Sequence, residues 1–226
     1  MTPALRRPRL TRAGVIEAAR DLLDDEGIET FSMSRLGDRL GVSAMALYRH
    51  VADRADLERA VAELVLADLG GTPAAEVPWP EDVAIWMHRV RDHWRRHPWL
   101  GRLLGDRTEL SPPWLAALDR LARILEDAGF PPEIVARELV RISRATAGTV
   151  VLENAAPLAH SSGLFGGLPE PERARWHPIV AHLARYHDDD LFADLIGDTL
   201  VRLRSTPPAT PELTRPTSSS RSPRRP

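Results

Sequence analysis

The stretch that most constrains this chain is LGVS at residues 40–43, because it leaves almost no chain between two short helical segments. On its N-terminal side, Ser34 is expected to cap a helix in which Leu36 and Leu40 share one face. On its C-terminal side, Ser43 is expected to cap the next helix. A glycine-containing turn of three or four residues sets two helices at a steep angle. The pattern therefore predicts a helix-turn-helix unit.

Two further helices are expected to flank this unit. One runs over Thr11–Leu23, with Thr11 as its N-cap and Gly27 placed to end it. The other begins at Asp53 or Ala55 and ends near residues 70–71. Its apolar face is expected to hold Leu57, Val61, Leu64 and Val65. The expected core of the helix-turn-helix unit consists of Leu36, Leu40, Val42, Leu47 and Val51.

The remainder of the chain also predicts helices, with proline and glycine at each junction and no convincing alternating strand pattern. The expected helices are Glu81–His97, Pro112–Ala128, Pro132–Asn154, Glu170–His187 and Asp189–Arg204. The fold class is therefore all-α, with an N-terminal three-helix helix-turn-helix domain followed by a larger helical ligand-binding and dimerisation domain. The expected boundaries are 1–70 for the first domain, 71–80 for a linker, 81–205 for the second domain and 206–226 for a disordered tail.

The amino-acid composition limits the cellular location of the protein and the kinds of site that it can form. The chain has no cysteine, so disulfides and thiolate sites are excluded and a cytoplasmic location is expected. No apolar run approaches the roughly 18 residues that span a bilayer, so no membrane partner is expected. The formal net charge of -2 gives no sign of a partner by itself.

Residues 43–50 show an order of side chains that suits the DNA major groove. The side chains of Ala44, Met45 and Ala46 take up little space on the first turn, so that the backbone can approach base edges and thymine methyl groups. Tyr48 and His50 then offer hydrogen-bond donors to phosphate oxygens, and Arg49 and Arg54 add guanidinium groups. Two alternatives remain open: the Tyr48 ring packs against the first helix, or His50 is a core residue.

The segment AARDLLDDEGIETFSMSRLGDRLGVSAMALYRHVADRADL, within residues 11–69, resembles the N-terminal domain of tetracycline-repressor-type (TetR family) transcriptional regulators. The resemblance implies base-facing positions at residues 43–46 and phosphate contacts at the start of the second helix. The sequence departs from the family at Arg54, where lysine is usual. Its base-facing positions also lack Asn or Gln to bind purines, so Arg35, Arg39 or DNA shape is expected to contribute to sequence recognition. The expected DNA-binding residues are Ser32, Ser34, Arg35, Ser43, Ala44, Met45, Ala46, Tyr48, Arg49, His50 and Arg54.

Such units act in pairs, one helical turn apart on a near-palindromic site, so a homodimer is expected. The helix over Pro132–Asn154 contains the small-residue run SRATAGT, and the one over Asp189–Arg204 has an apolar stripe. That stripe consists of Phe192, Leu195, Ile196, Thr199 and Leu203. The two helices are expected to form half of an intermolecular four-helix bundle, as the resemblance also implies. The alternative is that both stripes belong to the core of one chain.

The middle of the chain is rich in tryptophan, and the resemblance implies that this region encloses a small-molecule inducer. The expected ligand-binding residues are Trp86, Met87, Val90, Trp94, Trp114 and Phe130. The alternative is that most of these side chains are ordinary core residues.

Metal and catalytic sites are not expected. His93 and His97 share a helix face but lack a third ligand at matching spacing, so no metal and no cofactor are predicted. HSSGLFGG at residues 160–167 lacks the strand-turn-helix context of a nucleophilic serine and is expected to be a flexible loop. We therefore predict a non-enzymatic repressor of a double-stranded DNA operator, released by a small molecule. The alternative is an all-α small-molecule-binding or enzymatic protein in which the N-terminal helices are only structural.

Overall fold

A computed structural model describes residues 10–70, 77–105, 112–155, 167–183 and 185–206 of the chain. Within these ranges every regular element is a helix, which confirms the all-α prediction. The first group, here called the head, comprises α1 (Arg12–Glu26), α2 (Met33–Leu40), α3 (Ala44–Leu47) and α4 (Arg54–Leu66), which continues into the short 3-10 helix η1 (Ala67–Gly70). The second group, here called the body, comprises α5 (Trp79–Arg96), α6 (Leu100–Gly105), α7 (Pro112–Asp127), α8 (Pro132–Ala155), α9 (Glu170–Leu183) and α10 (Asp188–Arg204).

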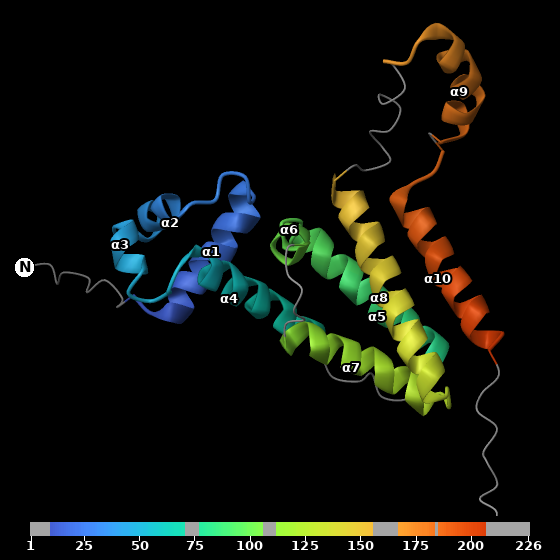
Figure 1. Cartoon of the computed structure of the whole chain (residues 1–226), viewed down its shortest axis with the longest axis horizontal. Helices are drawn as coiled ribbons and strands as arrows, with labels where there is room; N and C mark the ends of the chain where they lie inside the picture. The colour runs from blue at the N-terminus through green and yellow to red at the C-terminus, as the bar shows by residue number, and fades with distance from the viewer. Residues whose placement is uncertain (1–9, 71–76, 106–111, 156–166, 184, 207–226) are drawn as a thin grey trace, which may run out of the picture.

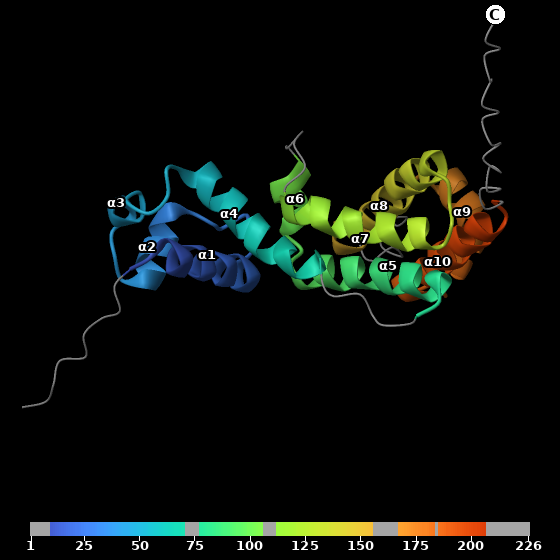
Figure 2. The same ribbon diagram turned by 90° about the horizontal axis from the view of Figure 1, so that it is seen from below.

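The helices are arranged along one long dimension, with the head at one end and α8 and α10 toward the other (Figure 1). Among the described residues, α2 and α3 lie farthest from the body, and the view from below shows the same order (Figure 2). α8 and α10 run mainly across the long dimension, and α9 stands off from the body without a buried residue among its described side chains. The helix-turn-helix is therefore presented at an extremity of the chain.

The caps of the head follow local side-chain chemistry. Thr11 caps α1, with its hydroxyl oxygen accepting the backbone N–H of Gly14 at 3.1 Å, and Gly27 ends the helix at φ +77°; both were predicted. The prediction that Ser34 caps α2 is wrong. Ser32 has the extended backbone of an N-cap and accepts the N–H of Arg35 at 3.2 Å, so Ser34 lies within the first turn.

Two glycines make the turn between α2 and α3 possible. Gly41 adopts the left-handed conformation at φ +66° and ends α2. Gly37 lies where α2 meets the following segment: a Cβ there would be 2.7 Å from the carbonyl oxygen of Val42 and 3.1 Å from the backbone nitrogen of Ala44. The steep approach of α3 to α2 thus depends on a missing side chain at Gly37 as well as on the turn itself.

The expected head core is mostly confirmed. Leu36, Leu47 and Val51 are buried, and Leu40 and Val42 pack at the edge of the same cluster. On α4 the buried face holds Leu57, Val61 and Val65, whereas Leu64, expected on that face, is 37% exposed.

The body differs from the sequence expectation by more than one residue at two helix boundaries, and it contains one helix that was not predicted. α5 begins at Trp79 rather than Glu81, because proline is tolerated in a first turn and Pro80 therefore does not delay the helix. α6 was not predicted, since its six residues are too few to show a helical period. α9 ends at Leu183 rather than His187.

The apolar stripe of α10 lies in the core of the chain. Phe192, Ile196, Thr199 and Leu203 are buried and Leu195 is half-buried against the same cluster. This burial supports the alternative that the stripe belongs to the core of one chain, because α10 packs it onto α8 and α5. The intermolecular bundle of the two helices stays a prediction. The residues of the expected loop at 160–166 and of the tail beyond residue 206 lie outside the described part of the chain.

None of the described helices combines the length and the apolar character needed to cross a membrane.

We expect Gly37→Ala to lower the free energy of unfolding by more than Gly41→Ala. The added methyl at residue 37 meets backbone atoms that cannot move without shifting α3, which costs about 1–3 kcal/mol. At Gly41 a Cβ meets no atom within 4 Å, so only the left-handed backbone is strained, at about 1 kcal/mol. Urea denaturation of both variants measures the order, and equal losses would contradict the close approach.

Candidate nucleic-acid interface

α3 exposes its leading turn while one side chain anchors it. Met45 is 75% exposed, and Ala44 and Ala46 are half-buried on either side of it. Leu47 is fully buried and holds the helix against the head core. The exposed Ser43 precedes the helix, and its side chain makes no capping hydrogen bond. The outer surface of α3 is therefore narrow enough for its backbone to approach a base edge.

The donors that follow lie on a turn rather than on a continued helix. The backbone N–H of His50 donates to the carbonyl oxygen of Leu47 at 2.8 Å, an i to i+3 bond that tightens the chain after α3. Tyr48 is 43% exposed, Arg49 is exposed and His50 is half-buried. The Tyr48 hydroxyl and the Arg49 guanidinium are thus placed beside the leading turn, where a phosphate strand would pass.

Arg12 and Asp56 brace this turn from both sides. The Arg12 guanidinium donates to Asp56 at 2.8 and 2.9 Å and to the backbone carbonyl of His50 at 2.9 Å. Asp56 also accepts the N–H of Ala52 at 3.0 Å and a bond from Arg59 at 3.0 Å. The bond from Arg12, followed by those from Ala52 and Arg59, holds the pKa of Asp56 well below its usual range, and the same bond raises the pKa of Arg12.

The sequence did not reveal this brace, because its two ends are 44 positions apart and neither end is an obvious motif residue. The acidic side chain in the first turn of α4 was the available signal.

The cations near α3 differ in how they are paired. Arg54 donates to Glu58 at 2.6 Å and lies over the Phe31 ring at 5.4 Å. Arg35 pairs with Glu26, and Arg39 pairs with Asp25 at 2.6 Å. Arg49 makes no ion pair with any residue that the structure describes. A phosphate would therefore share Arg35 and Arg54 with carboxylates, whereas Arg49 is available to it.

The two serines at the start of α2 are placed differently. Ser32 is half-buried and its oxygen accepts the N–H of Arg35, which leaves the hydroxyl proton to donate. Ser34 is exposed on the first turn. Both lie at the N-terminal end of α2, where the helix dipole favours an anion.

The head is joined to the body by side chains that the sequence analysis did not connect. Asp24, near the end of α1, accepts the Trp99 indole N–H at 2.7 Å and bonds to His97 Nδ1 at 2.8 Å. Arg102 on α6 pairs with Glu29, beside an open cavity of about 580 Å³ that also has Arg54 in its wall. Arg54, which was predicted to contact DNA, thus lines the same cavity as a residue of the body.

His97 has a partner other than a metal. Its ring and that of His93 are 5.2 Å apart, but His97 bonds to Asp24. In the described part of the chain, no three His, Cys, Asp or Glu residues are grouped so that they could hold a metal ion.

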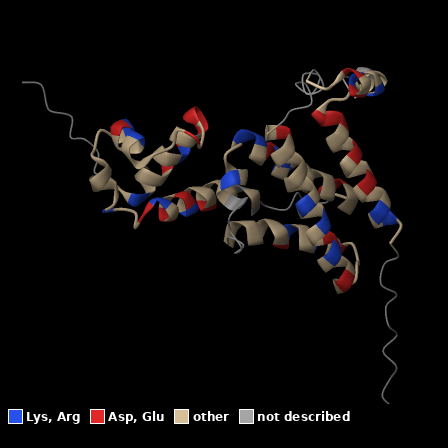
Figure 3. Ribbon diagram, turned by 45° about the horizontal axis from the view of Figure 1, so that its top comes forward, with Lys and Arg blue, Asp and Glu red and all other residues tan. Residues whose placement is uncertain are grey.

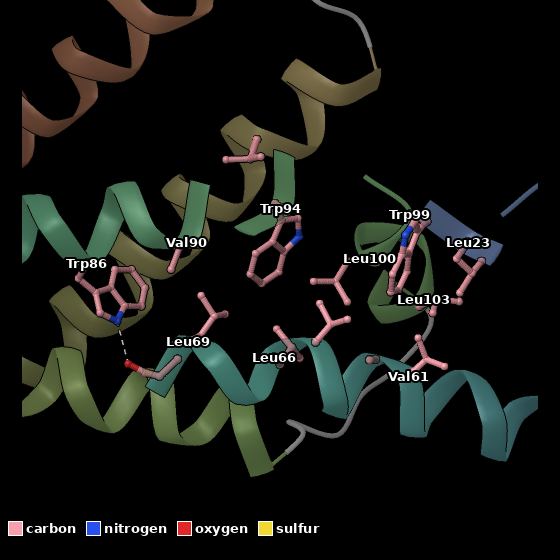
Figure 4. Packing of buried hydrophobic residues seen from close by; sticks show 14 of the residues in the cluster. Leu23, Val61, Leu66, Leu69, Trp86, Val90, Trp94, Trp99, Leu100 and Leu103 are labelled. Atoms are coloured by element: carbon pink, nitrogen blue, oxygen red, sulfur yellow. Dashed lines mark hydrogen bonds between the residues drawn. The ribbon is translucent and has the colours of Figure 1, made fainter. Parts of the chain in front are cut away.

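Of the residues predicted to bind ligand, Trp86, Val90 and Trp94 lie side by side along α5 and point into the hydrophobic core (Figure 4). Trp86 and Trp94 project from α5 toward α4 and η1, and the Trp86 indole N–H donates to the carbonyl of Ala117 at 2.8 Å. The Trp114 ring lies 5.3 Å from that of Trp94 and is only half-buried. Met87, Val90 and Phe130 are buried. All six residues thus belong to the large hydrophobic cluster, with Trp114 partly buried at its edge and Phe130 packed against Trp79.

Comparison with family models covers most of the chain. Residues 15–61 match bacterial regulatory proteins of the tetR family, and residues 72–188 match the tetracyclin repressor-like C-terminal domain.

Individual relatives agree with both matches. The class C tetracycline repressor protein of Escherichia coli is 32% identical over 152 residues, which is 65% of this chain and 68% of the relative. A solved structure of a possible TetR family transcriptional regulator from Streptomyces coelicolor A3(2) is 27% identical, with a TM-score of 0.73 over 86% of this chain and 98% of that chain. The Streptomyces coelicolor protein ActR, solved in complex with actinorhodin, is 23% identical, with a TM-score of 0.70 over 88% and 97% of the two chains.

We expect Asp56→Asn to lower the free energy of unfolding at pH 7 by roughly 1–2 kcal/mol, because the charged bonds to Arg12 and Arg59 are lost. Since folding lowers the pKa of Asp56, its charged form stabilises the folded protein fully above about pH 4. This contribution to the free energy of unfolding is lost as the pH falls further. The difference between variant and wild type, measured by urea denaturation, is therefore expected to shrink below pH 4. Asp38→Asn removes an exposed carboxylate of α2 and is expected to change stability by less than about 0.5 kcal/mol.

Proposed function

This chain belongs to the tetR family of bacterial regulatory proteins and is a DNA-binding transcriptional regulator; on that premise we propose that it is a homodimeric repressor of a palindromic operator, released by a small molecule. The observation that carries the proposal is the narrow helix α3 at the extremity of the head, with Met45 exposed on it and hydrogen-bond donors directly after it. In this proposal residues 1–70 bind DNA, residues 71–80 link, and residues 81–205 bind ligand and dimerise.

Within the head, the contacts divide into two kinds. Residues 43–46 face base edges, since their side chains are small or flexible and form the outer turn. The phosphate contacts come from Ser32, Ser34, Arg35, Tyr48, Arg49, His50 and Arg54. The brace between Arg12 and Asp56 fixes where the second group lies relative to the first.

The function is tested by selecting genomic fragments with the purified protein at two salt concentrations. A repressor of this kind selects a short palindrome with half-sites about 10 base pairs apart, and its affinity falls steeply as salt rises. Fragments without a shared sequence would contradict the proposal.

We expect Arg54→Ala to weaken binding to all sequences by a similar factor and to reduce the salt slope by about one, because Arg54 contacts phosphate. Arg123→Ala, on an exposed part of α7, removes the same charge and is expected to leave both quantities unchanged. Competition between operator and random DNA measures the factor. A larger loss for the operator than for random DNA would show that Arg54 reads bases.

Met45→Arg is expected to change which base pair is preferred in each half-site, because the new guanidinium reaches guanine where a methyl contact was made. Selection from a randomised operator library measures the preference. A uniform loss of affinity with the same preferred sequence would contradict a base-facing Met45.

We further propose that the small molecule enters beside Trp114 and contacts Trp86, Met87, Val90, Trp94 and Phe130 by parting α5 from α7. The position of Trp114 at the edge of this core supports that route. Tetracycline and actinorhodin, named with the relatives, are the probes, and at least one is expected to release the protein from its operator. Trp114→Phe should weaken the active probe by about fivefold through lost ring contact, whereas Trp176→Phe on α9 should not. Release by neither probe would contradict a shared ligand class.

A further inference from the structure

The open cavity of about 580 Å³ lies where the head meets the body. Its wall comes from the loop between α1 and α2, from the first two turns of α4 and from α6, which lies on the side of the body nearest the head (Figures 1 and 2). Sites for small molecules measure about 300–1,000 Å³, so the cavity has the size of one. None of the six residues assigned above to the inducer lines it. The cavity is therefore separate from the core between α5 and α7.

The apolar part of the cavity wall is held in place by the hydrophobic cluster. Phe31 and Leu103 line the cavity, yet only 3% and 8% of their surfaces are exposed. Ile28 is half-buried against the same cluster. Side chains packed in this way keep their positions when a ligand arrives. An apolar molecular frame would therefore meet a preformed surface.

Head and body each contribute one arginine to the wall. In the head, Arg54 Nε donates to Glu58 at 2.6 Å. Arg102 belongs to α6 of the body and pairs with Glu29 of the head. Acidic and basic segments both occur at this junction (Figure 3). The wall thus carries two guanidinium groups and two carboxylates that come from both parts of the chain.

The pair between Arg102 and Glu29 is open to exchange of partners. The side chain of Arg102 is 65% exposed and that of Glu29 is 72% exposed. Ion pairs this open to water contribute little to stability, because water and salt screen them. A ligand anion that replaces the Glu29 carboxylate at Arg102 therefore breaks a contact of little weight.

The donors of Arg54 favour an anion over a cation in this cavity. Arg54 uses Nε for Glu58, and its two terminal nitrogens have no partner among the described residues. The guanidinium lies over the Phe31 ring at 5.4 Å, so a ligand cation would compete with it for that ring face. Arg54 is also the first residue of α4, where the helix dipole favours negative charge.

We propose that this cavity is a second small-molecule site, for a compound with two anionic groups on an apolar frame. One group accepts hydrogen bonds from the terminal nitrogens of Arg54, the other replaces Glu29 at Arg102, and the frame contacts Phe31 and Leu103. The ligand then occupies donors of Arg54 that DNA would use, so it weakens DNA binding from outside the inducer site. This effect on DNA rests on the proposed phosphate contact of Arg54, whereas the site itself does not.

Isothermal titration calorimetry of the full-length protein, without DNA and in a buffer free of phosphate, tests the site. The probes are isophthalate with two carboxylates, benzoate with one, and benzamidine as a cation of similar frame. We expect isophthalate to bind with a dissociation constant of about 1 mM or tighter, and at least about fivefold more tightly than benzoate. Isophthalate that binds no better than benzoate, or benzamidine that binds best, would overturn the proposal.

Two variants that break the same ion pair are expected to act in opposite directions. Arg102→Gln removes a cation of the site and is expected to weaken isophthalate binding at least about fivefold. Glu29→Gln removes the competing carboxylate and is expected to strengthen it about twofold. Arg123→Gln is the matched control, because Arg123 is 67% exposed and pairs with Asp119, and it should leave the affinity unchanged. Effects of the same sign for the first two variants would assign the change to loss of the pair and refute the site.

Operator binding in the presence of the probe measures the effect on DNA. Saturating isophthalate is expected to weaken operator binding of the wild type about three- to tenfold relative to benzoate at equal ionic strength. The same concentration should leave operator binding of Arg102→Gln unchanged, since this variant does not bind the probe well. Isophthalate that binds in calorimetry but leaves the operator affinity unchanged would refute the competition for Arg54.

These measurements separate failure of this inference from failure of the proposed function. A protein that selects a palindrome but does not bind isophthalate retains its function and loses the second site. A protein that binds isophthalate through Arg102 but selects no palindrome retains the site and loses the proposed function.

Discussion

The packing of α4 and η1 is the constraint on which the rest of the structure depends. Leu57 and Val61 belong to the head core, and Leu66 and Leu69 farther along the same segment pack into the body core. Burying one such side chain contributes about 1.5–3 kcal/mol, so the segment cannot leave either core cheaply. α4 also contacts α1 on one side and α6 and α7 on the other. The position of α3 is consequently tied to how the body is packed.

Apolar contacts alone would not fix the angle of the head, because they are non-directional. Hydrogen bonds supply the direction. Asp24 receives the Trp99 indole N–H and bonds to His97, which ties the end of α1 to the segment between α5 and α6. The Arg12–Asp56 brace performs the corresponding task inside the head, between α1 and the turn after α3. A ligand that moves α6 or the end of α5 would act on DNA binding through the first of these contacts.

The parts of this fold that the sequence predicted are those decided by near neighbours. The cap at Thr11, the stop at Gly27 and most of the buried residues of the helix-turn-helix depend on spacings of a few positions. The family resemblance supplied the roles of residues 43–54, which spacing alone left open. The remaining features depend on partners distant in sequence.

Gly37 shows why those features were missed. A mid-helix glycine carries no local signal of the backbone that approaches it, and Asp24 is 75 positions from Trp99. The stripe on α10 was recognised correctly as a buried face, but periodicity gives only the direction of burial and not the identity of the covering surface. Its neighbours proved to be α8 and α5 of the same chain.

The burial of the α10 stripe within the chain leaves only the opposite face of α10 for contacts with other molecules. Since the apolar face is used within the chain, the outer face carries Asp194 and Asp198 with Gly197 between them. Charged faces add little net affinity when buried, but they penalise wrong partners and wrong registers strongly.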